Sequence, residues 1–150
     1  MALWSAITCL FLQHFVFKLV MVEGKSMMPT LKPGDGCLVN CWLPHFRGYQ
    51  RGDIVVIRDP IKEEFMAKRI IALGGDRVQL RGGRVYVNGA LASESYLYPG
   101  TQTYSRQLRE RIFTVGANSY FVMGDNRAES EDSRYFGDIY RGDLVGLITR

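Results

Sequence analysis

The stretch Asp-Arg-Val-Gln-Leu-Arg-Gly-Gly-Arg-Val-Tyr-Val-Asn-Gly, residues 76–89, decides the fold class of this chain. Apolar and polar residues alternate on both sides of Gly82-Gly83, which is the pattern of two strands joined by a tight turn. Asn88-Gly89 is a second strong turn signal. The sequence therefore predicts a β-hairpin made by residues 76–80 and 84–88.

The same pattern continues over most of the chain from residue 18 onward, where short apolar runs alternate with Gly, Asp and Asn turns. The other predicted strands are residues 18–23, 36–42, 53–58, 65–73, 119–123 and 143–149. The stretch 91–112 is polar, rich in Tyr and Arg and weakly periodic, so we interpret it as a long loop or an inserted extension. We expect a mostly β domain over residues 18–150, with a coiled antiparallel sheet that is partly barrel-like.

The N-terminus differs, because residues 1–17 carry no charged side chain. This length is at the short end for a membrane span, and we expect a short membrane-anchor helix there. A cleaved signal peptide and a buried core helix are alternatives. Most signal peptides have a basic residue before the apolar run, and this chain has none there. Lys18, Lys25 and Lys32 all follow the run, so the positive-inside rule weakly favours a cytoplasmic C-terminal domain.

Composition limits the possible partners. The chain is 47% hydrophobic and 23% charged, which is typical of one folded globular domain. Its net charge of +4 is modest and the basic residues are scattered, so we expect no nucleic-acid partner. Cys37 and Cys41 would lie roughly 13 Å apart in an extended strand, too far for a disulfide, although a turn near Asn40 would bring them closer. No His or Cys cluster has metal-ligand spacing, so we expect neither a metal nor a cofactor.

Ser26 opens the run Ser-Met-Met-Pro-Thr-Leu, residues 26–31, and a serine hydroxyl needs a base before it becomes a good nucleophile. Neither histidine has the setting of that base, since His14 lies in the apolar N-terminal run and His45 lies in a turn-like stretch. A lysine can serve when it is neutral near pH 7–8. This requires its pKa to fall by roughly 3 units from about 10.4, and burial in apolar surroundings can supply such a shift.

Lys68 is the candidate base. If residues 65–73 form a strand, Lys68 lies on one face and Arg69 on the other. The neighbours of Lys68 on its face are all apolar, namely Met66, Ile70 and Ala72. The structural alternative is a lysine that snorkels at a strand edge. Lys25 is a poor rival, because the side chains of Lys25 and Ser26 point opposite ways in an extended chain.

Four segments, in this order, resemble the sequence boxes of type I signal peptidases, membrane-anchored serine proteases that remove signal peptides from exported proteins. They are Ser-Met-Met-Pro-Thr-Leu (26–31), Arg-Gly-Asp-Ile-Val-Val (51–56), Lys-Arg-Ile-Ile-Ala-Leu-Gly-Gly-Asp (68–76) and Gly-Asp-Asn-Arg-x-x-Ser-x-Asp-Ser-Arg (124–134). The resemblance covers roughly residues 15–149. It implies that Ser26 is the nucleophile and Lys68 the general base.

The resemblance also implies roles for the last segment. Ser130 matches the serine that orients the lysine, while Asp132 and Arg134 match an ion pair that supports the loop. The backbone N–H of Ser26 would donate to the oxyanion. Some members of the family add a serine hydroxyl two residues before the nucleophile, and this chain has Gly24 there, so that donor is absent.

The implied substrates are signal peptides of exported preproteins. The resemblance implies small residues at the first and third positions before the cleaved bond (−1 and −3), typically Ala-x-Ala. The residues placed to line the shallow pockets are Val20, Val22, Met27, Leu31, Met66 and Ala67. The peptide would bind in extended form at strand edges near 20–24 and 65–68. The resemblance further implies a lipid bilayer as partner and a single-pass protein with its catalytic domain on the outer (trans) face of the cell membrane, against the charge rule.

Two other functions are compatible with parts of the sequence. A self-cleaving Ser-Lys repressor of the SOS type would share the dyad, but this chain has an apolar N-terminus and no room for a DNA-binding module. A non-catalytic membrane-anchored β module or inactive subunit is supported only by Gly24 and the short anchor.

Overall fold

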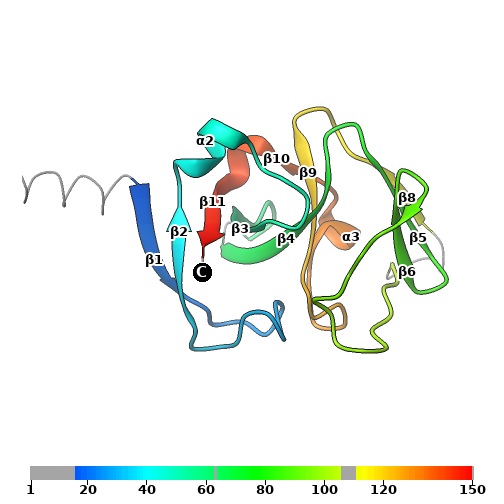
Figure 1. The fold of residues 1–150 in the computed structure, drawn as a ribbon, viewed down its shortest axis with the longest axis horizontal. Coiled ribbons are helices and arrows are strands. Elements are labelled where there is room, and N and C mark those ends of the chain that lie inside the picture. The colour runs from blue at the N-terminus through cyan, green and yellow to red at the C-terminus, as the bar shows by residue number, and fades with distance from the viewer. Residues whose placement is uncertain (1–15, 63, 106–110, 150) are drawn as a thin grey trace, which may run out of the picture.

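The computed structural model describes residues 16–62, 64–105 and 111–149, which fold into two antiparallel sheets (Figure 1). The anchor expected over residues 1–17 therefore lies almost entirely outside the described residues. Within the described part, no helix is both long enough and apolar enough to cross a membrane.

The larger sheet has seven strands in the order β1-β2-β11-β3-β4-β9-β10. Their bounds are β1 (Phe17–Met21), β2 (Gly36–Asn40), β3 (Ile54–Arg58), β4 (Phe65–Leu73), β9 (Ser119–Met123), β10 (Ile139–Tyr140) and β11 (Leu144–Thr149). Neighbouring strands are antiparallel, and the sheet curls into a half-barrel (Figure 1). The predicted mostly β, coiled antiparallel architecture is confirmed.

The smaller sheet has four strands in the order β7-β6-β5-β8. Its strands are β5 (Arg77–Arg81), β6 (Arg84–Val87), β7 (Ala90–Leu91) and β8 (Arg111–Thr114). The predicted hairpin is confirmed: β5 pairs with β6 through Gly82 and Gly83, whose φ angles of 56° and 74° favour glycine. The interpretation of 91–112 as only a loop or extension is wrong at both ends, because β7 and β8 pair with β6 and β5.

Short helices complete the described part of the chain. They are α2 (Leu43–Arg47), α3 (Ser133–Phe136) and the 3₁₀ helix η2 (Arg141–Asp143). None was expected, because segments of one turn or so are too short to show a helical period. The start of α3 has a recognisable cause, since the Asp132 side chain accepts a hydrogen bond from the backbone N–H of Arg134 at 3.2 Å.

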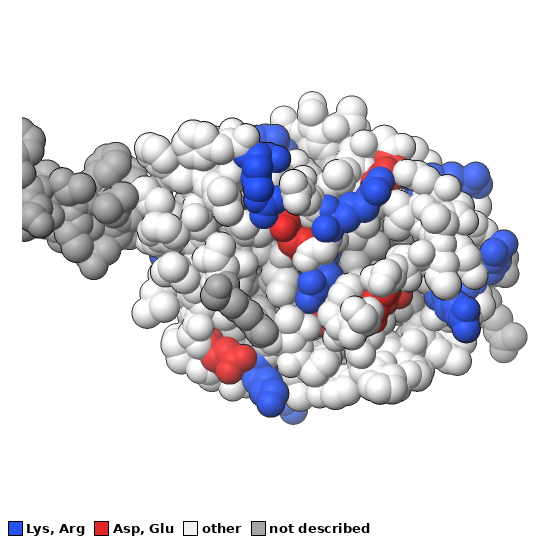
Figure 2. Space-filling model, viewed as in Figure 1, with Lys and Arg blue, Asp and Glu red and all other residues white. Residues whose placement is uncertain are grey.

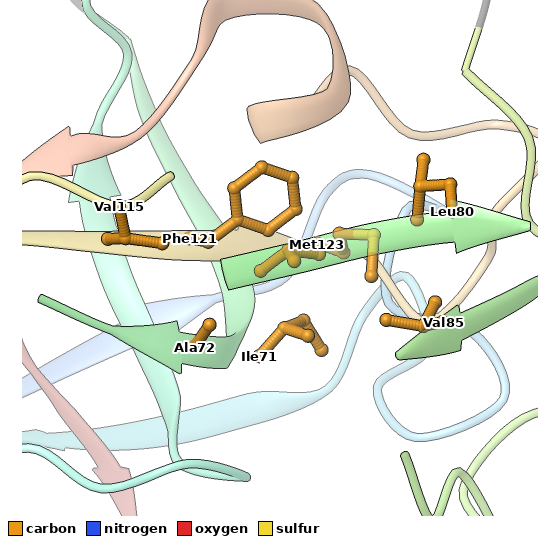
Figure 3. Close-up of a cluster of buried hydrophobic side chains, with 8 residues drawn as sticks. Ile71, Ala72, Leu80, Val85, Val115, Phe121 and Met123 are labelled. Atoms are coloured by element: carbon orange, nitrogen blue, oxygen red, sulfur yellow. The ribbon is translucent and has the colours of Figure 1, made fainter. Parts of the chain in front are cut away.

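The core has three apolar clusters. One fills the space between the two sheets, and Figure 3 shows its side chains converging from β4, β5, β6 and β9. The other two lie on opposite faces of the larger sheet. Val55 and Ile57 of β3 belong to one of them, while Val56 belongs to the other, as strand alternation requires. This packing fixes the position of the larger sheet on both faces.

The register of β4 departs from regular alternation. A bulge falls between Ile70 and Ala72 at the pairing with β9. Ile70 therefore packs with β3 and β11, whereas Ala72 packs between the sheets. The expectation that Ala72 shares the face of Lys68 is wrong for this reason, because a bulge shifts the alternation by one residue.

Candidate active site

Ser26 and Lys68 meet although they lie 42 residues apart in the chain. Ser26 begins the turn that follows β1, and Lys68 lies in β4 opposite Val55 of β3. Nζ of Lys68 and Oγ of Ser26 are 3.1 Å apart. This separation is within the reach required of a base that takes a proton from a nucleophile.

Lys68 is buried, with 2% of its surface exposed. Burial lowers the pKa of its amine by desolvating the charged form, and this effect exceeds the opposing influence of Asp132 and Asp59. Arg134 lowers the pKa further. No carboxylate of the described residues forms an ion pair with Lys68. The surroundings therefore favour a neutral amine, the form that can accept a proton.

The turn that carries Ser26 is held by two sets of contacts. The first is apolar, because Met27 and Leu31 are each 1% exposed and lie in one apolar cluster. In the second, the backbone N–H of Asn126 donates to the carbonyl oxygen of Ser26 at 2.9 Å, and Nδ2 of Asn126 donates to that of Lys25 at 3.3 Å. Ser26 is thus fixed to the apolar core and to the segment 124–134.

Residues 124–134, here called the 124–134 loop, are closed by the predicted ion pair. Asp132 accepts from Nε and Nη2 of Arg134 at 2.8 Å each, and from the backbone N–H of Gly124 at 3.1 Å. Arg134 also donates to the carbonyl oxygens of Arg127 at 2.8 Å and Ser130 at 3.4 Å. Both charged groups are buried, so these contacts hold the two ends of the loop together.

Ser130 lies beside the pair, but its expected hydrogen bond to Lys68 is not among the contacts of the described residues. Its Oγ is buried without a hydrogen-bond partner there. A Cβ atom placed on Gly124 would overlap both Oγ of Ser130 and the carbonyl oxygen of Ser26. The Ser130 hydroxyl therefore packs against the backbone of Gly124, next to the backbone of Ser26. A buried hydroxyl without a partner costs about 1–3 kcal/mol and is available to a neighbouring donor or acceptor.

A groove of about 590 Å³ opens beside Ser26. It is lined by Val20, Met21, Val22, Glu23, Gly24, Ser26, Met27, Val56, Glu64, Phe65, Met66, Ala67 and Ile148. The structure thus brings together all the predicted pocket residues except Leu31. Leu31 is buried in the cluster that underlies Met27, because its place at the end of the turn directs it into the core.

Strand edges without partners border this groove. In the described part of the chain, β1 pairs only with β2, and β9 pairs with β4 only from Arg69 onward. Residues 65–68 of β4 therefore pair with β3 on one side and have no strand on the other. Met21 and Phe65 are 62% and 65% exposed there. Such edges can accept an extended peptide as an added strand.

A buried ion pair that the sequence did not reveal lies on the other side of β4. Arg69 donates to both carboxylate oxygens of Asp125 at 2.8 and 2.7 Å, and Thr30 donates to Asp125 at 2.5 Å. The guanidinium also stacks 4.0 Å from the ring centroid of Tyr96. Sequence alternation separated Arg69 from Lys68, but no spacing rule pairs Arg69 with Asp125, 56 residues later. The pair ties the turn, β4 and the 124–134 loop together.

The surface around these elements carries both signs of charge. Figure 2 shows Lys and Arg interspersed with Asp and Glu over the face in view, without a continuous basic area. This agrees with the scattered basic residues noted in the sequence.

Comparisons with known proteins show the family to which this chain is similar. Residues 1–149 match the family model described as signal peptidase, peptidase S26. A signal peptidase I of Bacillus caldolyticus is 37% identical over 97% of this chain and 85% of its own length. One from Leptolyngbya laminosa is 33% identical over 95% of this chain and 71% of its own length. The crystal structure of a signal peptidase I from Enterococcus faecalis V583 is 32% identical, covers 67% of this chain and 97% of its own, and superimposes with a TM-score of 0.56.

Proposed function

This chain belongs to the signal peptidase family, peptidase S26, and we therefore propose that it uses Ser26 and Lys68 to cleave signal peptides from exported preproteins. As a member of that family it is a serine endopeptidase. The observation that carries the assignment of residues is the separation of 3.1 Å between a serine hydroxyl and a buried lysine amine with a lowered pKa.

The proposed reaction has two halves. In the first, the neutral Nζ of Lys68 takes the proton from Oγ of Ser26 while Oγ attacks the scissile carbonyl carbon. The resulting ammonium gives this proton to the leaving amine, and an acyl-enzyme remains. In the second half, Lys68 takes a proton from water as the water attacks the ester, and Oγ regains a proton when the acyl group leaves.

The remaining site residues support these steps. The backbone N–H of Ser26 would donate to the oxyanion, whereas Gly24 contributes no side-chain donor. The Ser130 hydroxyl would turn toward Lys68 and orient its amine. Asp132 and Arg134 would hold the 124–134 loop in place through their ion pair at 2.8 Å.

The groove suits a peptide with small side chains next to the cut. An extended peptide between β1 and residues 65–68 would place alternate side chains against the apolar wall formed by Val22, Met27, Met66 and Ala67. We propose cleavage after small residues at −1 and −3, of the Ala-x-Ala type. The supporting observation is that the lining next to Ser26 is largely apolar.

We also propose that residues 1–17 anchor the peptidase domain, residues 18–150, to the cell membrane as a single span. The catalytic domain would lie on the outer (trans) face, where exported preproteins emerge. Leu19, Met21 and Phe65 support a lipid-facing position of the groove, since each is more than half exposed. Lys18, Lys25 and Lys32 do not support this orientation, which rests on family membership.

Cleavage of a preprotein in detergent or lipid tests the proposal. We expect Ser26→Ala and Lys68→Ala each to lower kcat/KM about a thousandfold or more, because each removes a group that reacts. Lys25→Ala is the matched control, because it removes an exposed amine next to the nucleophile and should stay close to wild type. Full activity in Ser26→Ala or Lys68→Ala would exclude this dyad.

A further inference from the structure

The polar stretch 92–105, here called the extension, contacts the 124–134 loop through one buried arginine. The side chain of Arg127 has no exposed surface. Its Nη2 donates to Oε1 of Glu94 and its Nη1 donates to Oγ1 of Thr103, both at 2.5 Å. Its Nε donates to the carbonyl oxygen of Gly124 at 3.1 Å. Two of these partners belong to the extension and the third belongs to the loop itself.

Glu94 is the group that allows this guanidinium to be buried. A buried guanidinium stays charged and needs a carboxylate to compensate for the lost hydration. Glu94 is the ion-pair partner of Arg127 among the described residues, and its side chain is 14% exposed. Without this carboxylate, Arg127 would have to move toward solvent or toward another acid.

Arg127 fixes the backbone of Gly124, where the 124–134 loop packs against Ser26. Asp132 holds the N–H of Gly124, and Arg127 holds its carbonyl oxygen. The Cα of Gly124 has no room for a Cβ between Oγ of Ser130 and the carbonyl oxygen of Ser26. A displacement of Gly124 would therefore change the space in which the Ser130 hydroxyl lies beside the nucleophile.

The extension also contacts a second buried arginine, Arg69. The Tyr96 ring lies against the guanidinium of Arg69, and its hydroxyl accepts from Nη2 of Arg127 at 3.4 Å. The Tyr96 hydroxyl further donates to Glu94 at 3.2 Å. Glu94 is thus joined to Arg127 directly and through Tyr96, and this arrangement holds its carboxylate in one position.

We propose that Glu94 is a positioning residue for peptide cleavage, and that it acts through Arg127 to fix Gly124 and thereby the Ser130 hydroxyl beside Ser26 and Lys68. This inference rests on the proposed function, because it assumes that Ser26 and Lys68 carry out the cleavage. It gives the extension a role that does not involve contact with the substrate, since neither Glu94 nor Arg127 lines the groove.

The test compares kcat, KM and the pH dependence of kcat/KM for Glu94→Gln, Glu94→Asp and wild type. We expect Glu94→Gln to lower kcat about tenfold with KM nearly unchanged, because a displaced loop misplaces the reacting groups but leaves the groove intact. Its ascending pH limb should move to higher pH, because a looser loop admits water to Lys68. Glu94→Asp keeps the charge and should recover part of kcat.

Asp53→Asn is the matched control. Asp53 accepts from both terminal nitrogens of Arg47 at 3.0 Å, so it is also the acid of an arginine pair, but it has no contact with the 124–134 loop. The substitution should lower stability at most, and should leave kcat and the pH limb of the folded enzyme unchanged. A purely structural role of Glu94 would give the same result as this control.

If Glu94→Gln reduces only the folded fraction, with wild-type kcat and pH limb per folded molecule, the inference is overturned. If this variant does not fold, Thr103→Val decides, because it removes the second partner of Arg127 with little change in shape. We expect the same changes on a smaller scale, and wild-type values would overturn the inference. Failure of the proposed function would be distinguishable, since Ser26→Ala or Lys68→Ala would then retain activity.

Discussion

Strand β4 buries two cationic side chains at adjacent positions and surrounds them in opposite ways. Lys68 is 2% exposed and has a serine hydroxyl at 3.1 Å, with no carboxylate bonded to it among the described residues. Arg69 is 8% exposed, donates to both oxygens of Asp125 and stacks on Tyr96. One side of the strand therefore favours a neutral amine, and the other side keeps a permanent charge.

The different surroundings of Lys68 and Arg69 show how one strand can carry a neutral amine and also a cation that links neighbouring segments. A buried charge without a partner is so unfavourable that a lysine gives up its proton, whereas a guanidinium cannot. Pairing removes most of that cost and turns the cation into a fixed cross-link. Burial, together with the nearby Arg134, thus favours the neutral form of Lys68, and burial together with Asp125 makes Arg69 a connection between three segments.

The largest effect on activity is expected when Lys68, which has no ion pair among the described residues, is replaced by arginine, the residue type at position 69. Lys68→Arg places a guanidinium that stays protonated beside Ser26, so no base remains and kcat/KM should fall about a thousandfold or more. The matched exchange, Arg69→Lys, keeps a cation beside Asp125 but loses the second hydrogen bond and the stacking on Tyr96, so it should lower stability and retain most activity per folded molecule. Preprotein cleavage measures both, and an active Lys68→Arg variant would remove the contrast between the two positions.

The next effect is a loss of stability when the ion pair between Arg69 and Asp125 is broken. Asp125→Asn leaves Arg69 buried without a counter-charge and weakens the hydrogen bond from Thr30. We expect the free energy of unfolding to fall by about 3 kcal/mol. Denaturant unfolding measures the change, with Asp53→Asn at the more exposed Arg47 pair as control, where the loss should be about 1 kcal/mol or less. Equal losses for the two variants would mean that burial does not strengthen the Arg69 pair.

Gly124 connects the surroundings of Lys68 and Arg69. It directly precedes Asp125, the partner of Arg69, and it packs against Ser130 and the backbone of Ser26. Gly124→Ala should lower kcat about a hundredfold, because its Cβ would overlap with the carbonyl oxygen of Ser26 and move the nucleophile. Gly34→Ala is a useful control for strain alone, because position 34 has φ of 91° but open space around it. If Gly124→Ala kept its kcat, the close approach of the loop to the nucleophile would have no role in catalysis.

The last effect is a gain in stability at Lys68 and not a loss. Lys68→Met removes the cost of a buried amine and should raise the free energy of unfolding at neutral pH. Because the pKa of Lys68 is lowered in the folded state, the wild type becomes more stable as pH rises from this lowered pKa to the ordinary value. The gain from Lys68→Met should therefore be largest below this window and vanish above it. A gain independent of pH would point to packing alone.

Much of this arrangement was predictable from local patterns. Alternation and turn residues predicted the hairpin of β5 and β6 and the main strands of the larger sheet, because each depends on neighbours in sequence. The pairing of Ser26 with Lys68 followed from the resemblance of their segments to the sequence boxes of type I signal peptidases. Strands β7 and β10 were missed, because two residues are too short for a periodic signal. Strand β8 was missed because its sequence Arg-Ile-Phe-Thr does not alternate and begins inside the polar stretch 91–112.

Two buried ion pairs of the site, unlike the Asp132–Arg134 pair, were not predicted, because each joins segments far apart in sequence. The pairs Arg69–Asp125 and Glu94–Arg127 span 56 and 33 residues. Leu31 was assigned to the substrate pocket, but the fold of the turn directs it into the core. A single sequence shows which residues are polar, and it does not show which distant partner each one meets.

The protonation state of Lys68 tests the central claim most directly. The chain has five lysines, and the other four, Lys18, Lys25, Lys32 and Lys62, are exposed. NMR titration of 13C-labelled lysine side chains can follow all five, with Lys68 assigned from the signal missing in Lys68→Arg. The account predicts that Lys68 loses its proton at a pH clearly below the ordinary lysine pKa, and that kcat/KM rises over the same interval. Titration of Lys68 at the ordinary lysine value of about 10.4 or above would contradict it.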